Sequence, residues 1–307
     1  MDAFVHHFSA SGVETYWFVP PLVMFVVSSL ASMGGLSGAF ILLPFQMSVL
    51  GYTTPGVSAT NLVYNVVAIP LGVYRHIREG RLAWPLFTLL VLGTVPGMFA
   101  GYYIRVTYLP DPGHFQLFVG LVLGYMGVRT LYGAVADLRT RRAADGAQRP
   151  SPGGSITGGR LTLSEAAIDF QGQTHRFAPA PVFLLSLIVG VVGGTYGIGG
   201  GAVMAPYCIA VLHLPVGVVS GAALLSTWVS SLAAALCYAY VPVGGAPNAS
   251  PDWLLGGLFG LGGMAGIYVG ARLQQRVPTV VIKFIVALAI LFIAVRYTWP
   301  SAAQLLG

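Results

Sequence analysis

The sequence reads Gly193-Gly194-Thr195-Tyr196-Gly197-Ile198-Gly199-Gly200-Gly201 in the middle of an apolar segment that extends from Val182 to Leu212. A second apolar segment, Trp17–Leu50, is interrupted in the same way by Gly34-Gly35-Leu36-Ser37-Gly38. A glycine inside a helix costs about 1 kcal/mol relative to alanine, so such clusters mark breaks. Each segment therefore crosses a membrane once as a broken helix, or enters it and returns as a hairpin.

The two interrupted segments belong to an internal repeat. Residues 35–69 align without a gap on residues 197–231, at a constant offset of 162. The glycine, proline and serine matches carry the most weight, because apolar matches arise easily by chance in membrane segments. These matches are Gly35/Gly197, Gly38/Gly200, Pro44/Pro206 and Ser58/Ser220. We infer that one ancestral unit was duplicated, giving two homologous halves.

The composition places both halves in a lipid bilayer. Hydrophobic residues make up 56% of the 307 residues and charged residues only 8%, whereas a soluble domain carries about 25% charged residues. Several apolar runs reach the roughly 20 residues that cross a bilayer as a helix, and lipid leaves helices or closed barrels as the only options. The alternation typical of a barrel does not appear. The sequence predicts an all-α polytopic membrane protein.

The repeat divides the chain into three parts. The first membrane repeat covers 17–136 and contains predicted crossing helices at 57–74, 83–104 and 115–135. The second covers 179–298, with predicted helices at 217–240, 253–271 and 280–297. Residues 137–178 are less hydrophobic and form a predicted cytoplasmic linker. Within it, Gln171-Gly172-Gln173 reads as the turn of a small hairpin.

Positive charges favour the hairpin form of the broken segments. In that arrangement the cytoplasmic loops are 75–81, 129–178 and 272–283, and they hold 13 of the 15 Lys and Arg residues. A single crossing would move 272–283 outside and 241–252 inside, leaving 11. A hairpin plus three crossings is an odd unit, so the halves would be inverted repeats, as in many secondary transporters. We expect a multi-pass protein of the inner membrane.

Three motifs resemble those of the TauE/SafE sulfite exporter family, also called the 4-toluene sulfonate uptake permease family. They are the Gly-Gly-x-Ser-Gly start at Gly34–Gly38 with Pro44, its counterpart at Gly197–Pro206, and Ser58-Ala59-Thr60-Asn61. The resemblance implies secondary transport of sulfite, an organosulfonate or another small sulfur-containing anion. It fixes neither compound nor direction; export by alternating access is the expectation. Ala222-Ala223 replaces Thr60-Asn61 in the second half, so a polar site would be asymmetric.

The glycine-rich breaks are the first candidate anion site. Helix N-termini offer unpaired N–H groups and partial positive charge, and glycine lets an anion approach the backbone. The alternative is that the glycines only permit tight helix crossing. The candidate residues in or beside the breaks are Gly35, Ser37, Gly38, Thr195, Tyr196, Gly199, Gly200 and Gly201.

Polar side chains on the neighbouring helices form a second candidate group. Asn61 and Asn65 are four residues apart and share one helix face. Such groups are expensive in lipid, so they face the interior and either contact the substrate or tie helices together. The candidates are Gln46, Asn61, Tyr64, Asn65, Ser226, Thr227 and Ser230.

Charged residues limit the other functions. No acidic residue lies inside a predicted span, which argues against a carboxylate sodium site or a buried carboxylate proton relay and suits an anionic substrate. We expect no catalytic residue, metal, cofactor or nucleic-acid partner; proton coupling and a homodimer stay open. Arg75 and Arg105 stand where they would attract anions to a mouth, although loop arginines are mostly topology signals.

Three alternatives stay open. The cargo could be a carboxylate or a neutral sulfur compound. Gly35-Leu36-Ser37-Gly38 has the form found around some membrane serine nucleophiles, but an intramembrane hydrolase also needs a base within reach, and the second half keeps glycine in place of Ser37. A scaffold protein is the third alternative. We expect a transporter and not an enzyme.

Overall fold

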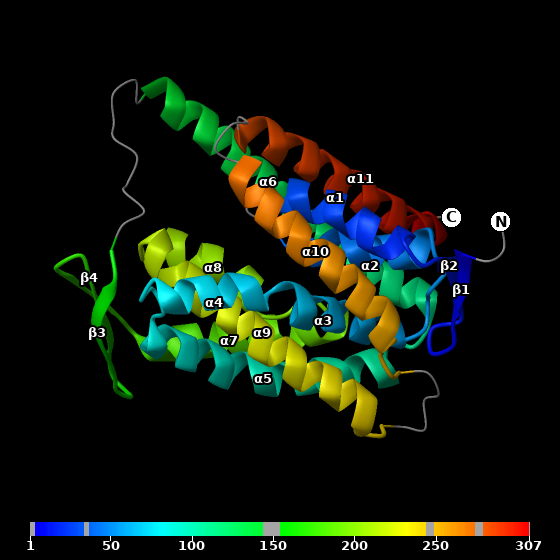
Figure 1. The fold of residues 1–307 in the computed structure, drawn as a ribbon, viewed down its shortest axis with the longest axis horizontal. Coiled ribbons are helices and arrows are strands. Elements are labelled where there is room, and N and C mark those ends of the chain that lie inside the picture. Colours follow the sequence, from blue (N-terminus) through cyan, green and yellow to red (C-terminus); the bar gives the residue numbers. More distant parts are fainter. Residues whose placement is uncertain (1–3, 34–36, 144–153, 244–248, 274–278, 307) are drawn as a thin grey trace.

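The computed structural model describes residues 4–33, 37–143, 154–243, 249–273 and 279–306, and helices dominate it (Figure 1). The first half holds β1 (Val5–Phe8), β2 (Val13–Tyr16), α1 (Val19–Met33), α2 (Ala39–Ser48), α3 (Gly56–Ala68), α4 (Pro70–Arg78), α5 (Trp84–Thr107) and α6 (Pro112–Ala143). The middle holds β3 (Ile156–Leu161), β4 (Ala166–Phe170) and β5 (Gln173–Phe177). The second half holds α7 (Pro179–Tyr196), α8 (Gly201–Ala210), α9 (Val216–Tyr240), α10 (Trp253–Leu273) and α11 (Thr279–Leu306).

Helices long enough to span a bilayer occur in both halves. Within the described residues, seven helical segments are long and apolar enough to cross. Three of them follow α2, and three follow the broken pair α7–α8, as the repeat predicts. The seventh is α7 itself, whereas α1 and α2 are shorter. The prediction of an all-helical, multi-pass membrane domain is confirmed.

The first predicted crossing helix is kinked. Pro70 has no N–H, so the carbonyl of Val66, four residues earlier, loses its helical donor. Trp228 Nε1, on α9 of the second half, donates to that oxygen at 3.0 Å. The helix expected over 57–74 is therefore two helices, α3 and α4, and the freed carbonyl is satisfied across the interface between the halves.

The two broken segments return to opposite ends of the molecule (Figure 1). One end holds β1 and β2, where Ser11 Oγ donates to Asp252 Oδ2 at 2.7 Å. The end of α2 lies there too, because Ser48 Oγ is hydrogen-bonded to the Tyr297 hydroxyl at 2.6 Å. At the other end, α7 begins directly after β5, and α8 ends close to the start of α9. Two oppositely opening hairpins agree with inverted halves; the inversion itself stays a prediction.

Glycine stripes hold the two halves together. Helix α5 packs against α7, and α10 packs against α1, so each half supplies the partner of the other half's broken segment. At Gly97 a Cβ would overlap the carbonyl oxygen of Leu187, and at Gly266 one would overlap that of Phe25. The contacts are backbone to backbone, which only small residues allow. The two stripes therefore serve helix packing. Their members are Gly93, Gly97 and Gly101 on α5, and Gly262, Gly266 and Gly270 on α10.

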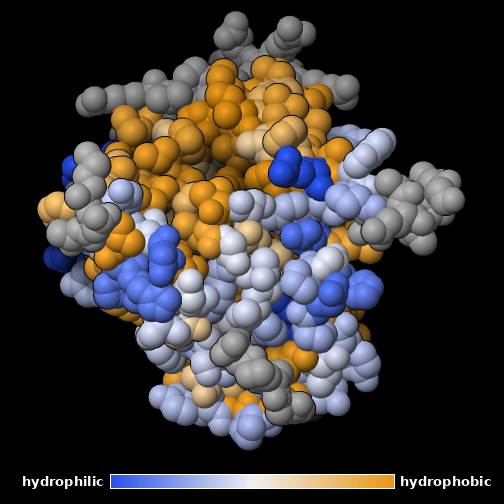
Figure 2. Space-filling model, turned by 90° about the vertical axis from the view of Figure 1, so that its right-hand side faces the viewer, coloured by the Kyte–Doolittle hydropathy of each residue, from blue (hydrophilic) through white to orange (hydrophobic). Residues whose placement is uncertain are grey.

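Two small antiparallel sheets lie outside the helical body. Strands β3, β4 and β5 form one sheet in that order, with a turn at Gln171-Gly172. The predicted hairpin is thus its second half, and β3 is an additional strand. Strands β1 and β2 form a hairpin that the sequence analysis did not predict. Figure 2 views the end that carries this hairpin: hydrophilic residues cover much of the face, and hydrophobic surface dominates the side of α6 and α11.

Candidate functional site

Asn61 joins the two breaks at the centre of the molecule. Its Nδ2 donates to the carbonyl of Ala39 at 3.0 Å, at the start of α2, and to that of Gly197 at 2.9 Å, between α7 and α8. Both breaks therefore meet on one side chain of α3. Asn61 is fully buried. The carbonyl of Ala39 also accepts the first intrahelical bonds of α2, whereas Gly197 lies between two helices, so its carbonyl would otherwise lack a donor in the membrane interior.

The second break requires glycine for two reasons. Gly197 ends α7 in the left-handed region, with φ of 96°, and Gly199 follows with φ of 75°. L-residues with a side chain rarely adopt this conformation. In addition, a Cβ on Gly197 would overlap the carbonyl oxygen of Ser58 on α3. The glycines thus let the chain reverse while it touches α3.

The first break is completed by Tyr196 from the second half. Pro44 lies within α2 and cannot donate to the carbonyl of Phe40. The Tyr196 hydroxyl donates to that oxygen at 2.8 Å. The Tyr196 hydroxyl therefore uses its only hydrogen to stabilise α2. Tyr196 lies beside the breaks, as predicted.

Three polar groups of the predicted residues are buried without a partner in the described structure. They are Gln46 Oε1, Asn65 Oδ1 and Ser226 Oγ. Gln46 Nε2 lies 3.5 Å from Asn61 Oδ1, and Asn65 Nδ2 donates to Ser231 Oγ at 3.3 Å. A buried polar atom without a partner costs about 1–3 kcal/mol. These atoms are the strongest indication of a ligand among the predicted residues.

The hydrogen-bond network fixes the role of Gln46. Because Asn61 Nδ2 donates to two carbonyls, Asn61 Oδ1 must be an acceptor. Gln46 therefore turns its Nε2 toward Asn61, and its Oε1 is left as an acceptor. Asn65 has more freedom, because Ser231 can accept or donate. The centre thus offers one fixed acceptor, one adaptable amide and the Ser226 hydroxyl.

The remaining predicted residues make contacts within the protein. The Tyr64 hydroxyl is bonded to Ser28 Oγ at 2.9 Å, and both lie where a Cβ on Gly38 would be. Thr195 Oγ1 is 3.0 Å from the carbonyl of Gly101 on α5. The others are placed as follows: Ser37 Oγ accepts from Ala39 N, Thr227 and Ser230 donate to backbone oxygens of α9, Gly199 faces Thr227 and Ser231, Gly200 faces Thr94, Gly201 faces Ala223, and Gly35 lies outside the described residues.

Sequence reasoning missed one residue. Ser231, the partner of Asn65, is absent from the predicted group, which holds Ser226 and Ser230 of the same helix. Arg105, which the sequence places at a mouth, is fully buried in the last turn of α5.

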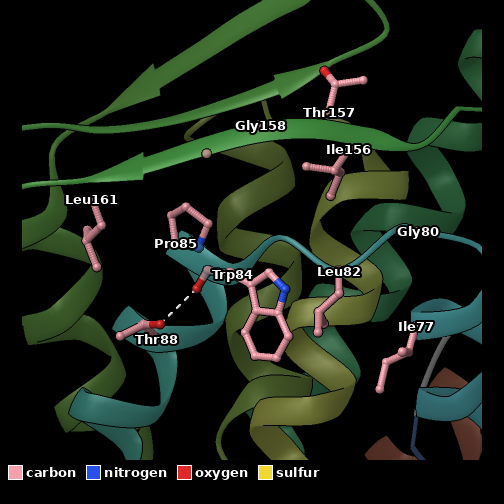
Figure 3. A pocket seen from close by; sticks show the side chains of 11 residues that line it. Ile77, Gly80, Leu82, Trp84, Pro85, Thr88, Ile156, Thr157, Gly158 and Leu161 are labelled. Atoms are coloured by element: carbon pink, nitrogen blue, oxygen red, sulfur yellow. Dashed lines mark hydrogen bonds between the residues drawn. The ribbon is translucent and has the colours of Figure 1, made fainter.

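The central residues are closed off from both ends. Gln46, Asn61, Asn65 and Ser226 have no exposed surface. One hollow of about 510 Å³ lies between the α4–α5 turn and β3, where Ile77, Leu82 and Trp84 face Ile156 (Figure 3). Another of about 310 Å³ lies at the opposite end and is lined by Tyr102 and Tyr238. Neither hollow includes a predicted site residue.

Comparisons with known proteins agree with this architecture. The family model described as "Sulfite exporter TauE/SafE" matches residues 21–297. A "Probable membrane transporter protein YjnA" of Bacillus subtilis (strain 168) is 24% identical over 265 residues, covering 86% of this chain and 93% of the relative. A "Probable membrane transporter protein" of Xylella fastidiosa (strain 9a5c) is 24% identical over 285 residues, covering 91% and 93%. No solved structure matches. The chain therefore belongs to the sulfite exporter TauE/SafE family of transmembrane transporters.

Proposed function

We propose that this protein is a secondary transporter that carries a small sulfur-containing oxyanion, sulfite above all, out of the cell by alternating access. The observation that carries the proposal is the meeting of both breaks on Asn61, beside the unpartnered Gln46 Oε1, Asn65 Oδ1 and Ser226 Oγ. Broken helices that meet at the midplane are the usual site of substrate binding in transporters.

The chemistry of these groups suits a singly protonated oxyanion. Ser226 and, after rotation, the Asn65 amide can donate to anionic oxygens. Gln46 Oε1 accepts only, so it is satisfied best by a ligand that carries one hydroxyl. Hydrogensulfite has both features, with one protonated oxygen and a negative charge on the others. This supports sulfite carried with its proton, and it links transport to pH without a buried carboxylate.

The polar groups proposed to bind the anion are side chains, in addition to the helix N-termini that the sequence predicts. Gly38 and Gly200 are packed against side chains of α3 and α5, so the glycines bring helices together and the side chains of α2, α3 and α9 supply the polar groups. The short helices α2 and α8 still point their N-termini toward the same centre and favour negative charge there.

Flux into liposomes tests the proposal. Purified protein is reconstituted, and uptake of sulfite, thiosulfate, sulfoacetate, taurine and lactate is measured with and without a pH gradient. We expect uptake of sulfite to exceed that of lactate and to fall as external pH rises, because the singly protonated form becomes scarce. Lactate flux equal to that of sulfite would indicate a carboxylate as the substrate. Absence of flux with folded protein would overturn the proposal.

The serine hydrolase alternative is tested in the same preparation. The hydrogen bond that the structure gives Ser37 Oγ comes from the backbone N–H of Ala39. Ser37→Ala removes the nucleophile that a hydrolase would need. Sulfite flux that survives this substitution supports a transporter, whereas an ester- or peptide-cleaving activity of the parent protein that vanishes with it would establish the enzyme.

A further inference from the structure

Arg105 is a buried cation with one edge left unused. It lies in the last turn of α5 and has no exposed surface. Its Nη1 donates to the carbonyl of Leu109, and its guanidinium lies 3.6 Å over the ring of Phe115. Nε and Nη2 have no partner in the described structure. One amino group and one face are thus occupied, and two nitrogens remain free.

The two free nitrogens form the edge that binds oxyanions. The N–H bonds of Nε and Nη2 point in the same direction, and a carboxylate, sulfite or phosphate accepts from both at once. Arginine provides this planar fork, whereas lysine provides only a point charge. Since Leu109 and Phe115 hold the rest of the guanidinium, the edge is also fixed in orientation.

No carboxylate of the described residues occupies that edge. Asp252 Oδ2 accepts from Ser11, and its Oδ1 accepts from the N–H of Leu255 at the start of α10. Asp111 Oδ1 accepts from the N–H of His114 and is exposed. Glu14, on β2 at the same end, is paired with His7 at 3.2 Å. The three acidic groups that the structure describes at this end are therefore engaged elsewhere. A buried arginine without a counter-ion is costly in a membrane unless a ligand supplies the charge.

Two tyrosines surround the arginine. Tyr52 and Tyr238 are close enough to interact with Arg105 electrostatically. Burial raises the pKa of the Tyr52 phenol to about 12, so this loop residue stays a neutral hydroxyl and cannot serve as the counter-ion. Tyr238 lines the hollow of about 310 Å³ at this end, and its hydroxyl donates to the carbonyl of Gly194 near the second break at 2.9 Å. Tyr238 therefore links this hollow and Arg105 to the end of α7 that precedes the second break.

We propose that Arg105 is a second anion site, which holds a small oxyanion on its Nε and Nη2 edge at the end of the molecule that carries β1 and β2. This inference rests on the proposed function, because the ligand is the transported anion on its way between the centre and that end. The arginine provides the full positive charge that the neutral central site lacks.

Four proteins test the proposal: the parent, Arg105→Met, Arg105→Lys and Arg296→Met. Methionine removes the charge and retains an unbranched chain, so the fold should survive without the unpaired cation. Lysine keeps a charge that can rest on Phe115 and donate to Leu109, but it lacks the edge. Arg296 is exposed on α11 and serves as the matched loss of one charge. Sulfite flux is measured from each side in membrane vesicles of both orientations.

We expect Arg105→Met and Arg105→Lys to raise the KM for sulfite offered at the β1–β2 end by roughly tenfold or more, since two charge-assisted hydrogen bonds are lost. The KM at the other end, the maximal rate and the elution from a sizing column should match the parent. Arg296→Met should match the parent at both ends. Parent-like behaviour of Arg105→Lys, or an equal effect of Arg296→Met, would overturn the site.

A separate readout distinguishes this inference from the transport proposal. The rise in unfolding temperature with increasing sulfite is measured for the four detergent-solubilised proteins. If the parent shows no flux, the transport proposal fails, and the Arg105 site is judged on this rise alone. A rise that is lost in Arg105→Met and kept in Arg296→Met supports the site, and a rise that is equal in all four or absent from the parent refutes it.

Discussion

Two neighbouring amides at the centre have different tasks. Asn61 donates both side-chain N–H groups to backbone carbonyls of the two breaks, so its side chain stabilises the fold. Gln46 makes one long contact with Asn61 and leaves Oε1 without a partner. The two residue types look equivalent in the sequence, but we expect removal of Asn61 to lower stability and removal of Gln46 to weaken ligand binding.

Gln46→Met separates these tasks. Methionine has a similar volume and removes a buried acceptor that no protein group satisfies, so we expect an unfolding temperature equal to or above that of the parent. Sulfite flux at low concentration should fall roughly tenfold, because one hydrogen bond to the ligand is lost. Thermal unfolding and liposome flux measure the two effects on one preparation. Unchanged flux would show that Gln46 only fills space.

Asn61→Ala should behave in the opposite way. It leaves the carbonyl of Gly197 buried without a donor, which costs about 1–3 kcal/mol, and removes a second hydrogen bond to the carbonyl of Ala39. We expect a clear loss of thermal stability as well as loss of flux. Asn65→Ala is the comparison, because Asn65 has one hydrogen bond, at 3.3 Å. Equal stability of the two variants would contradict the bridging role of Asn61.

At the scale of elements, prolines couple the two halves. Pro44 frees the carbonyl of Phe40 in α2, and Tyr196 of the second half takes it. Pro70 frees the carbonyl of Val66 in α3, and Trp228 of the second half takes it. A proline inside a membrane helix is tolerated when another group satisfies the carbonyl that it exposes. Here that group comes from the other half in both cases, so each kink also joins the halves.

The contact between α10 and α1 can be tested with two glycines of the same helix. A Cβ on Gly266 would overlap the carbonyl oxygen of Phe25, and backbone cannot move aside as a side chain can. Gly257 has no neighbour within 4 Å of the same position. We expect Gly266→Ala to destabilise the protein by about 1–3 kcal/mol, as overpacking does. Gly257→Ala should be neutral or slightly stabilising, because alanine favours helix. Similar unfolding temperatures for both variants would refute backbone contact at Gly266.

The sequence predicted elements better than contacts. Long apolar runs with glycine breaks located the six crossing helices and both interruptions, because lipid forces every such run into a helix. The strand pairs β1–β2 and β3–β4 were not predicted, since short polar strands carry no strong periodicity. The partners of Asn61 and Asn65 could not be read from spacing, because Gly197 and Ser231 lie more than a hundred residues away. The burial of Arg105 could not be read from the sequence, because the helix predicted over 83–104 continues to Thr107 and takes this residue into its last turn.

The whole molecule is closed around its centre. Each broken segment packs on a helix of the other half: α7 on α5, and α1 on α10. The interfaces are glycine stripes, where the backbones approach closely. Gln46 and Asn65 have no exposed surface, so a ligand reaches them only if helices move. We expect that movement at these interfaces, because they join the two halves. Alternating access would therefore use the same contacts that hold the halves together.

The direction in which each hairpin opens gives the last prediction. If α1–α2 and α7–α8 both return to their own side, Ser250 in the α9–α10 loop lies outside the cell and Ala271 at the end of α10 lies inside. If the second segment crossed once, the two positions would exchange sides. Both residues are exposed, so each can be replaced by cysteine and labelled.

Labelling of intact cells with a membrane-impermeant maleimide decides between these arrangements. We expect Ser250→Cys to react in intact cells and Ala271→Cys to react only after lysis. Leu163→Cys, at the fully exposed β3–β4 turn, should behave like Ala271→Cys because the linker is cytoplasmic in both arrangements. Cys208 and Cys237 are buried, so the parent protein sets the background. Reaction of Ala271→Cys in intact cells would show that the halves do not have opposite orientations, and the inverted repeat would then be wrong.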